Sequence, residues 1–483
     1  MVEPVKRRAA ARGAAIFALA ILASLASPHA ANAAINPWMA SNVYNPQKWD
    51  TAGPDTATPW LHPPPYEPNQ GWGMLDPSSA FLDGHWHDDT NLTGSWGGAR
   101  DTLMEHGLAL SAAYFGQLSA NPVGGVVEGQ TTWRGDLAVG VFADLQRIAN
   151  WERTYFTATF DWKDGTNSLT NAYIQNQLPV QLDNGDDDGA TRLVNLAVGK
   201  QLFDNDAEVV LGRLVTGEEF ATLRLACTSL NQAICGNPIA AAQSISFPTF
   251  PFGVWGGHFK VKPGDTWSAQ VGSYLVFPSF RDPSYHGTNF SAPEGSGALT
   301  LAEVQYLTAQ RVPGSLPGRI KLGGYFDTEE LTNVETETPV RGTGGVYLMG
   351  QQMLFSTGKS GTVSETDVGL SGWLSLSWAP PNRNRVSSMV AGGLSYQGIL
   401  PSRPWDGLAF IAAYASYSSD LRDGQRARGE PLQHGEVILE LNYRWSLASW
   451  LWLQPDIQGV IQPKGRSDVP DAIAVGIAIG FVL

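Results

Sequence analysis

The feature that most constrains this chain is a two-residue alternation of side chains that persists from about residue 108 onward. Alternate residues of a β-strand point to opposite faces, so a period of two predicts strands. A strand with one large apolar face and one face of small residues is typical of a wall between lipid and a water-filled lumen. The last segment shows this pattern most plainly, with Ile473, Val475, Ile477, Ile479, Phe481 and Leu483 alternating with Ala472, Ala474, Gly476, Ala478, Gly480 and Val482.

Similar segments recur along the chain, and they predict an all-β fold, a transmembrane antiparallel β-barrel of about 16 strands over residues 108–483. Bacterial single-chain barrels of this kind have an even number of strands. The expected strands lie near residues 108–118, 132–147, 153–163, 190–202, 207–215, 252–262, 266–276, 299–309, 318–328, 346–356, 366–378, 387–397, 408–418, 434–447, 450–461 and 471–483.

The connections between these segments alternate in length, as expected for short periplasmic turns and long external loops. The external set includes residues 119–131, 164–189, 216–251, 277–298 and 329–345, and the periplasmic set includes 148–152, 203–206, 263–265 and 448–449. The alternation weakens between residues 357 and 433. A soluble β-sandwich or propeller would also alternate in side-chain polarity, but it does not predict such asymmetric loops.

Composition supports a barrel over membrane helices. The chain has 53 Gly, 17 Trp and 14 Tyr and only 16% charged residues, yet its hydrophobic content is 43%. Beyond residue 33 we find no apolar run of about 18 residues, the length that a spanning helix needs. Only helices and closed barrels satisfy every backbone polar group in lipid, so a membrane form of this chain would be a barrel.

The N-terminal part predicts export. Residues 1–33 have the basic start, short apolar run and A-x-A end of a signal peptide, with cleavage after Ala33. Residues 34–91 are rich in Pro and Trp and predict an extended periplasmic arm. Residues 92–107 predict a short periplasmic helix, with Thr93 as its N-cap and Gly107 after its end.

Charged residues inside the predicted strands indicate which faces line the lumen. In two neighbouring strands, Arg134, Asp136, Asp161 and Lys163 lie opposite apolar faces, and a charge costs less toward water than toward lipid. Arg213 is also expected to face the lumen, although a bulge is then needed to keep Leu211 outside.

The connection 216–251 is the longest in the chain, and a loop of this length usually has a function. We expect it to fold into the lumen and narrow it, with an external cap as the alternative. Its Glu218, Glu219, Phe220 and Arg224 are then candidates for contact with a solute. Cys227 and Cys235 are expected to form a local disulfide, because the chain is exported and a metal site would need more ligands.

Enzymatic and nucleic-acid functions find little support. The sequence has no G-x-S-x-G, H-E-x-x-H or P-loop motif, so an outer-membrane hydrolase would depend on a Ser/His pair that uses His258, His286 or His434. A net charge of −14 disfavours nucleic acid. We expect no cofactor and no metal, and we expect outer-membrane lipids as neighbours.

Several short motifs in order resemble the carbohydrate-selective porin family of the OprB type. They are Leu92–Gly98 (LTGSWGG) with Arg100, Asp144-Leu145 before Trp151, Leu316-Pro317-Gly318 before Gly323-Gly324-Tyr325, and Leu453–Asp456 (LQPD) with Gln458 and Pro463. The resemblance implies a 16-stranded outer-membrane porin of Gram-negative bacteria, which passes glucose and related sugars through a constriction of Arg, acidic and aromatic residues. The sequence departs from the family in two ways: it finishes in Phe481-Val482-Leu483 rather than on an aromatic residue, and the arm before residue 92 is long and rich in Pro.

The expectation is therefore passive diffusion of small sugars through a water-filled barrel that the inward-folded loop narrows. The alternatives are a general or cation-preferring porin, a hydrolase and a structural barrel. The sequence leaves open whether the barrel works alone or as a homotrimer.

Overall fold

The computed structural model describes residues 92–182, 191–203, 206–263, 266–282, 285–288, 291, 293, 295–308, 316–357, 368–448 and 450–483. The expected signal peptide and periplasmic arm, residues 1–91, lie outside the described residues. Within the described part, no helix is long and apolar enough to cross a membrane.

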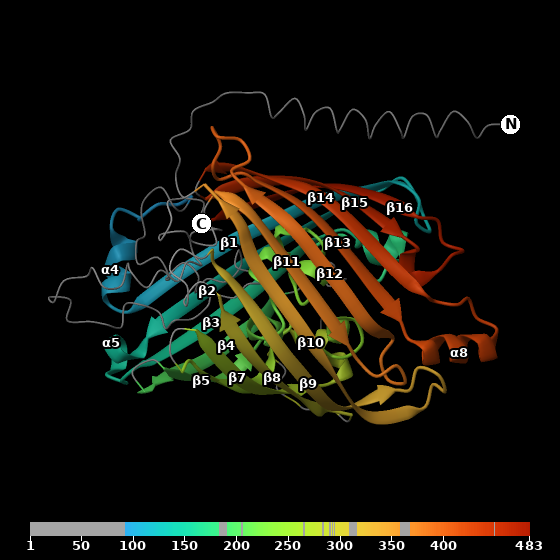
Figure 1. Cartoon of the computed structure of the whole chain (residues 1–483). Coiled ribbons are helices and arrows are strands. Elements are labelled where there is room, and N and C mark those ends of the chain that lie inside the picture. Colours follow the sequence, from blue (N-terminus) through green and yellow to red (C-terminus); the bar gives the residue numbers. More distant parts are fainter. Residues whose placement is uncertain are drawn as a thin grey trace.

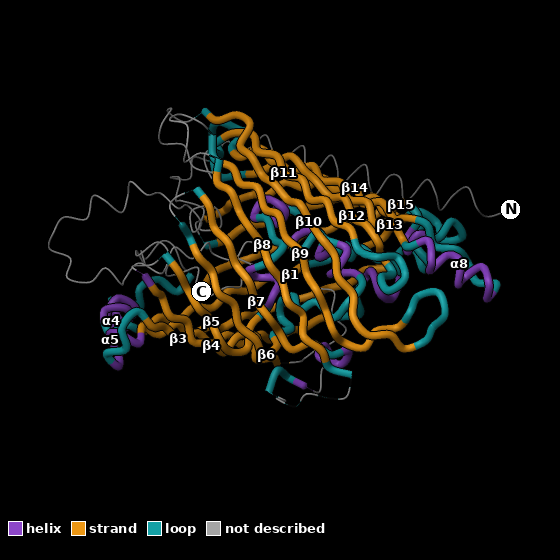
Figure 2. The backbone as a smooth tube through the Cα atoms, turned by 60° about the horizontal axis from the view of Figure 1, so that its bottom comes forward, coloured by secondary structure: helices purple, strands orange, loops and turns teal. Residues whose placement is uncertain are grey.

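Sixteen strands of the described chain close into one antiparallel barrel, in which β1 pairs with both β2 and β16 (Figures 1 and 2). The predicted fold class is therefore confirmed. The strands are β1 (Leu108–Val123), β2 (Gln130–Asp144), β3 (Thr154–Gly165), β4 (Thr191–Leu202), β5 (Ala207–Leu214), β6 (Val254–Val261), β7 (Trp267–Val276), β8 (Gly297–Leu307), β9 (Gly318–Thr332), β10 (Pro339–Ser356), β11 (Gly369–Trp378), β12 (Val386–Gln397), β13 (Gly407–Tyr417), β14 (Gly435–Ala448), β15 (Leu451–Ile461) and β16 (Ala472–Val482).

The helices are short and lie at the two ends of the barrel or inside it (Figure 2). At the ends or in the end loops are α4 (Ala99–Glu105), α5 (Leu145–Ala149), η6 (Pro278–Arg281), α8 (Ser419–Arg428) and η8 (Pro463–Gly465). The connections β3–β4 and β5–β6 contain η2 (Leu169–Ile174), α6 (Thr216–Glu219), η4 (Arg224–Thr228), α7 (Gln232–Cys235) and η5 (Ala240–Gln243).

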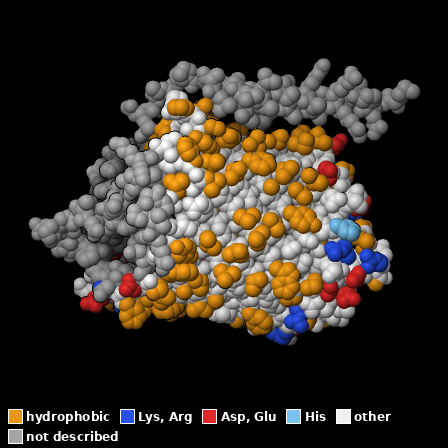
Figure 3. All heavy atoms as spheres, viewed as in Figure 1, with side chains coloured by type: hydrophobic (Ala, Val, Ile, Leu, Met, Phe, Trp, Pro, Cys, Tyr) orange, Lys and Arg blue, Asp and Glu red, His pale blue; other side chains and the backbone are white. Residues whose placement is uncertain are grey.

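The outer wall of the barrel is apolar, and its inner wall is polar. On β11, Leu374, Leu376 and Trp378 are exposed on the outside, whereas Ser371 and Ser375 are buried inside. The same alternation around the barrel gives the belt of apolar side chains in Figure 3, with charged residues gathered at the ends. A surface of this kind matches the hydrocarbon layer of a bilayer.

Several boundaries differ from the sequence-based expectation; β1, for example, runs to Val123 rather than to residue 118. The external loop predicted over residues 329–345 is shorter than expected, because β9 runs to Thr332 and β10 begins at Pro339. These strand ends rise above the apolar belt, so they lack the outward aliphatic residues from which a strand was inferred. The helix predicted over residues 92–107 is shorter, with α4 beginning only at Ala99.

The LTGSWGG segment forms a turn beside the seam where the first strand, β1, pairs with the last strand, β16. Gly94, Gly97 and Gly98 have positive φ angles, which prevents a regular helix there. Thr93 is not an N-cap: its Oγ1 accepts hydrogen bonds from Trp96 Nε1 at 3.1 Å and Arg100 Nη2 at 2.9 Å. Arg100 Nη2 also donates to the carbonyl oxygen of Leu483 at 2.7 Å, beside the closing pair β1–β16.

Candidate functional site

The connection between β5 and β6, residues 215–253, lies inside the barrel (Figure 2) and is called here the constriction loop. Its apolar side chains pack against the inner wall, with Phe220, Leu223 and Phe247 fully buried in one cluster with strand residues. The loop therefore folds inward, as expected from its length, rather than forming an external cap.

Polar side chains from the barrel wall hold the constriction loop by its backbone. Glu303 on β8 accepts from the backbone N–H of Ala221 at 2.9 Å, and Glu440 on β14 accepts from Leu230 N–H at 2.8 Å. Further wall residues that bond to the loop are Gln351, Ser375, Ser377, Asn442 and Gln454. Because these groups come from strands around much of the barrel, the loop is fixed across the lumen rather than along one edge.

A disulfide joins Cys227 and Cys235 within this loop. Both residues are buried, and they flank the segment around Ser229 and Leu230 that binds Glu440. The cross-link therefore confines the part of the loop that reaches β14.

A second external connection, between β3 and β4, also enters the lumen, and this inward course was not predicted from the sequence. Residues 166–182, here the second inward loop, are held by Glu436 on β14, which accepts from the backbone N–H groups of Gln177 and Leu178, each at 2.7 Å. Asn231 Nδ2 donates to the carbonyl oxygen of Leu178 at 3.2 Å and so connects the two loops. The available signal was the apolar content of this segment, since Leu169, Ile174, Leu178, Val180 and Leu182 are unusual in a water-exposed loop.

Where the constriction loop faces β6–β9, it leaves a polar cavity. The loop contributes Glu218, Glu219 and Thr222, and the wall contributes Lys260, Ser268, Gln270, Glu303, Gln305 and Lys321. The cavity lining thus combines three carboxylates, two ammonium groups, two amides and two hydroxyls.

The charges in this cavity are organised around Glu303. Lys321 Nζ lies 3.3 Å from Glu303 Oε1, and Gln270 Nε2 donates to the same oxygen at 3.1 Å. Tyr347 OH donates to Glu303 Oε2 at 2.9 Å. Gln270 Nε2 also donates to the backbone carbonyl of Glu219 at 2.8 Å, which ties the loop to the wall at the cavity.

The predicted lumen residues on β2 and β3 do face inward, but they are buried and do not line the cavity. Lys163 lies directly opposite Asp136 in the strand pairing, and Arg192 lies opposite Asp161. Arg134 Nη1 donates to the carbonyl oxygen of Thr166 at 2.7 Å, so this side chain holds the start of the second inward loop.

The remaining candidates have different positions. Glu218 and Glu219 line the cavity, whereas Phe220 is buried edge-on to Tyr274, with ring centroids 6.3 Å apart. Arg224 begins η4. Arg213 is buried and donates to the Leu193 carbonyl at 2.9 Å, while Leu211 stays exposed outside. The alternation is interrupted between them at Gly212, whose φ is +149°.

The cavity residues on the wall were missed by the sequence analysis, although the same reasoning could have found them. Lys260, Gln270, Glu303, Gln305 and Lys321 are polar residues within otherwise apolar strands. Their strand neighbours Phe259, Val271, Val304, Ile320 and Leu322 are exposed on the lipid side. Alternation therefore identifies an inward face, but it does not say which inward residues the loops leave uncovered.

Arg281, which lies outside the strands, joins an external loop to the constriction loop. Arg281 at the end of η6 donates from Nη2 to the Phe247 carbonyl at 3.0 Å, and its own carbonyl accepts from Arg192 Nη2 at 2.9 Å. Burial lowers the pKa of Arg281, and the negative charge of Glu329 partly opposes that shift. Among the described residues there is no group of three or more His, Cys, Asp or Glu placed to hold a metal ion.

Comparison with known proteins agrees with this architecture. The family model described as carbohydrate-selective porin, OprB family, matches residues 130–483. Porin B of Pseudomonas aeruginosa is 28% identical over 424 residues, which cover 81% of this chain and 91% of that protein. A high-pH structure of Pseudomonas putida OprB has the same fold, with a TM-score of 0.75 at 24% identity, and the alignment covers 82% of this chain and 99% of that one. The fold and the extent of the family match together show that this chain belongs to the carbohydrate-selective porin, OprB family, whose members form channels in the outer membrane of Gram-negative bacteria.

Proposed function

We propose that this porin lets small neutral sugars of the glucose type diffuse passively through the barrel, along the residues that line the polar cavity. The observation that carries the proposal is the lining of that cavity. Carboxylates, ammonium groups, amides and hydroxyls face one another across it, from the constriction loop on one side and β6–β9 on the other.

Such a lining suits polyhydroxylated solutes. A sugar hydroxyl both donates and accepts, so it can replace water at an acidic oxygen and at an ammonium group alike. The charges of Glu303 and Lys321 compensate each other, and Gln270 donates to the same carboxylate, so this pair leaves little net charge for a salt ion to neutralise. A conducting site must also release its solute quickly, and hydrogen bonds to groups that already have partners are weak enough for this.

The test is solute-specific swelling of liposomes that contain the purified barrel, with glucose, larger saccharides, amino acids and matched ions as solutes. We expect glucose to permeate faster than non-sugars of equal size. If the permeation rate depended only on the size of the solute, the protein would be a general porin. A preference for cations would support the cation-preferring alternative. Absence of permeation would remove the channel function and return hydrolase and structural roles to consideration.

Variants test whether the polar cavity is the path. Lys260→Gln and Glu218→Gln each remove one charged hydrogen-bonding group from the lining, and we expect glucose permeation to change by roughly twofold to tenfold, as for loss of one such bond. Arg426→Gln is the matched control, because Arg426 lies on α8, where it pairs with Asp423. An equal effect of all three changes would place the limiting step elsewhere.

We also propose that residues 1–33 direct export and are cleaved after Ala33, and that residues 34–91 form a periplasmic arm. Mass spectrometry of the protein from outer-membrane fractions would give the mature N-terminus. The mass of the barrel in detergent would distinguish a single chain from a homotrimer.

A further inference from the structure

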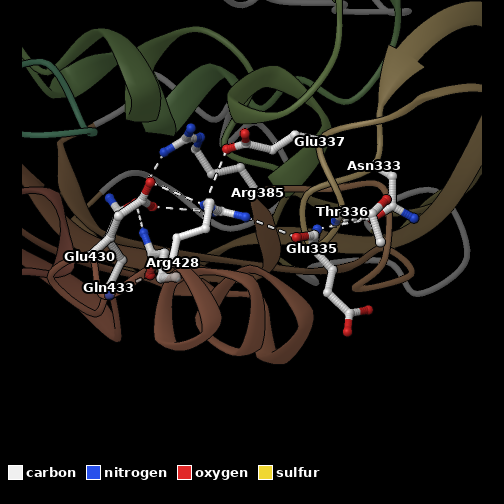
Figure 4. A network of polar contacts seen from close by, with 9 residues as sticks. Asn333, Glu335, Thr336, Glu337, Arg385, Arg428, Glu430 and Gln433 are labelled. Carbon is white, nitrogen blue, oxygen red and sulfur yellow. Dashed lines mark hydrogen bonds and ion pairs between the residues drawn. The ribbon is translucent and has the colours of Figure 1, made fainter.

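A second pocket lies away from the polar cavity and is lined in part by α8. Figure 1 shows α8 at one end of the barrel, and Figure 4 shows several of the lining residues. The pocket has a volume of about 510 Å³. The connections β9–β10, β11–β12, β13–β14 and β15–β16 form its walls. Counted from β1, all four are odd-numbered connections, so they lie on the same side of the barrel as the predicted external loops. The pocket therefore faces the medium from which a solute arrives.

The lining of this external pocket has an excess of positive charge. It contains five cationic side chains, Arg383, Arg385, Arg428, Lys464 and Arg466, but only two carboxylates, Glu337 and Glu430. Both carboxylates are engaged by one arginine, since Arg428 Nε lies 3.3 Å from Glu337 Oε1 and 3.0 Å from Glu430 Oε1 (Figure 4).

Three of the cations have no such partner among the residues that the structure describes. Arg466 is neutralised by Asp468, to which its Nε donates at 2.9 Å. In the described part of the chain, the ion pairs include no carboxylate partner for Arg383, Arg385 or Lys464. Arg383 bonds instead to the carbonyl oxygens of Arg341 and Gly342.

Buried amides fix the position of these cations. Gln433 is only 4% exposed, and its Oε1 accepts from Arg385 Nη1 at 3.0 Å and from Gln425 Nε2 at 2.8 Å. Gln433 Nε2 donates to the carbonyl of Lys464 at 2.8 Å. A single buried side chain thus connects α8, the β11–β12 turn and the turn at η8.

The backbone that presents Lys464 is strained. Gln462 and Lys464 both have left-handed φ angles, of 54° and 58°, which non-glycine residues rarely adopt. The N–H of Lys464 is held by Glu436 Oε2 at 2.5 Å. Strained backbone that the surrounding structure holds in place is typical of binding sites.

We propose that this external pocket binds a sugar acid by its carboxylate and so concentrates acidic monosaccharides at the mouth of the channel. The chain as a whole carries a net charge of −14, which repels anions at a distance. A local cluster of unneutralised cations reverses that repulsion at the mouth. The proposal rests on the proposed function only in assuming that carbohydrates are the permeating class.

The volume and the remaining polar groups favour a sugar acid over a bare anion. Ligand pockets usually have volumes of roughly 300–1,000 Å³, so this one has room for a whole monosaccharide. Asn333 and Glu337, on the wall opposite Gln433, offer amide and carboxylate groups to hydroxyls (Figure 4). Arg385 and Lys464 then hold the carboxylate.

The test is calorimetric titration of the full barrel in detergent with sodium glucuronate, with glucose, sodium chloride and inorganic phosphate as comparison ligands. We expect saturable binding of glucuronate that weakens as the salt concentration rises. Arg385→Gln and Lys464→Gln are each expected to weaken binding roughly twofold to fivefold, the effect of one exposed charge pair. Arg426→Gln makes the same charge change on α8 outside the pocket and is expected to leave binding unchanged.

Several results would overturn the proposal. They are absence of saturable glucuronate binding, equal binding of glucose, equal loss in Arg426→Gln, or phosphate binding as tight as that of glucuronate, which would indicate an anion site without sugar recognition. Glucose permeation in liposomes is measured in parallel. If glucuronate binds but glucose does not permeate, the neutral-sugar function fails while the pocket stands, and the reverse result rejects the pocket alone.

Discussion

At the scale of single residues, Glu303 is the group on which the polar cavity depends most. Its two oxygens accept from Ala221 N–H, Gln270 and Tyr347 and pair with Lys321. Both members of the ion pair are nearly inaccessible to water, with side chains 4% and 2% exposed. Removing one partner of a buried pair leaves the other charge without compensation.

Glu303→Gln is therefore expected to destabilise the folded barrel by about 3–5 kcal/mol and to loosen the constriction loop at Ala221. Urea unfolding of the barrel in lipid vesicles measures the first effect, and noise in single-channel current measures the second. Glu330→Gln is the control, because Glu330 pairs with Arg341 at a largely exposed site, where such a pair contributes about 1 kcal/mol or less. Similar losses in both variants would contradict the role given to Glu303.

The sequence predicted well which face of a strand a residue lies on, but it did not predict which other residues that residue contacts in the lumen. Alternation placed Arg134, Asp136, Asp161 and Lys163 on the inner wall, where the structure has them buried. It did not show that Arg134 would meet the second inward loop at Thr166, because that contact depends on how a loop folds back. The two-residue period tells which side chains point into the lumen. Which loop fills the lumen depends on contacts between residues that are distant in the sequence.

At the scale of elements, the strands followed closely from the sequence and the loops did not. A strand can be located from its own sequence, because every second side chain faces lipid and is apolar. Its position can therefore be predicted without knowing where the other strands lie. The β9–β10 hairpin departs from this because its outer ends leave the lipid and lose the apolar signal. The inward course of residues 166–182 depends on Glu436, which is more than 250 residues away along the chain.

The constriction loop combines a disulfide with bonds to the wall. Replacing both Cys227 and Cys235 by Ser is expected to cost about 2–4 kcal/mol, as for loss of a native disulfide. The loop should stay inside the barrel, because the wall bonds to Ala221 and Ala240 lie outside the cross-linked segment. We expect a lower Tm and a noisier current with nearly unchanged mean conductance, and wild-type protein treated with a reductant as the control. A large rise in mean conductance would show that the disulfide alone holds the loop.

At the scale of the whole molecule, the closure between β1 and β16 is reinforced from the periplasmic side by Arg100. This residue is 5% exposed, and it bonds to Thr93 and to the carbonyl of Leu483. The Leu92 N–H also donates to the Val482 carbonyl at 2.8 Å. The LTGSWGGAR segment thus stabilises the seam between β1 and β16, which gives a structural reason for that motif.

Arg100→Ala is expected to destabilise the barrel by about 1–3 kcal/mol, because two bonds at the seam are lost and a carbonyl is left unpaired. The gel shift between folded and heated protein gives the fraction of closed barrel and the temperature at which it opens. Arg153→Ala, in the β2–β3 turn away from the seam, is the control. An unchanged opening temperature for Arg100→Ala would show that strand pairing alone holds the seam.

The same seam has a consequence for synthesis. The two strands that pair at the seam are far apart in the sequence, so Ala113 is synthesised early and its partner Val482 is synthesised last. Until β16 emerges, the edge of β1 has no neighbour, and an unpaired edge neither enters lipid nor resists aggregation. The barrel therefore cannot close strand by strand during synthesis. Chaperones have to keep the chain unfolded until β16 has been made. A chain shortened by a premature stop codon would have two unpaired strand edges and would be degraded. It would not form a smaller pore.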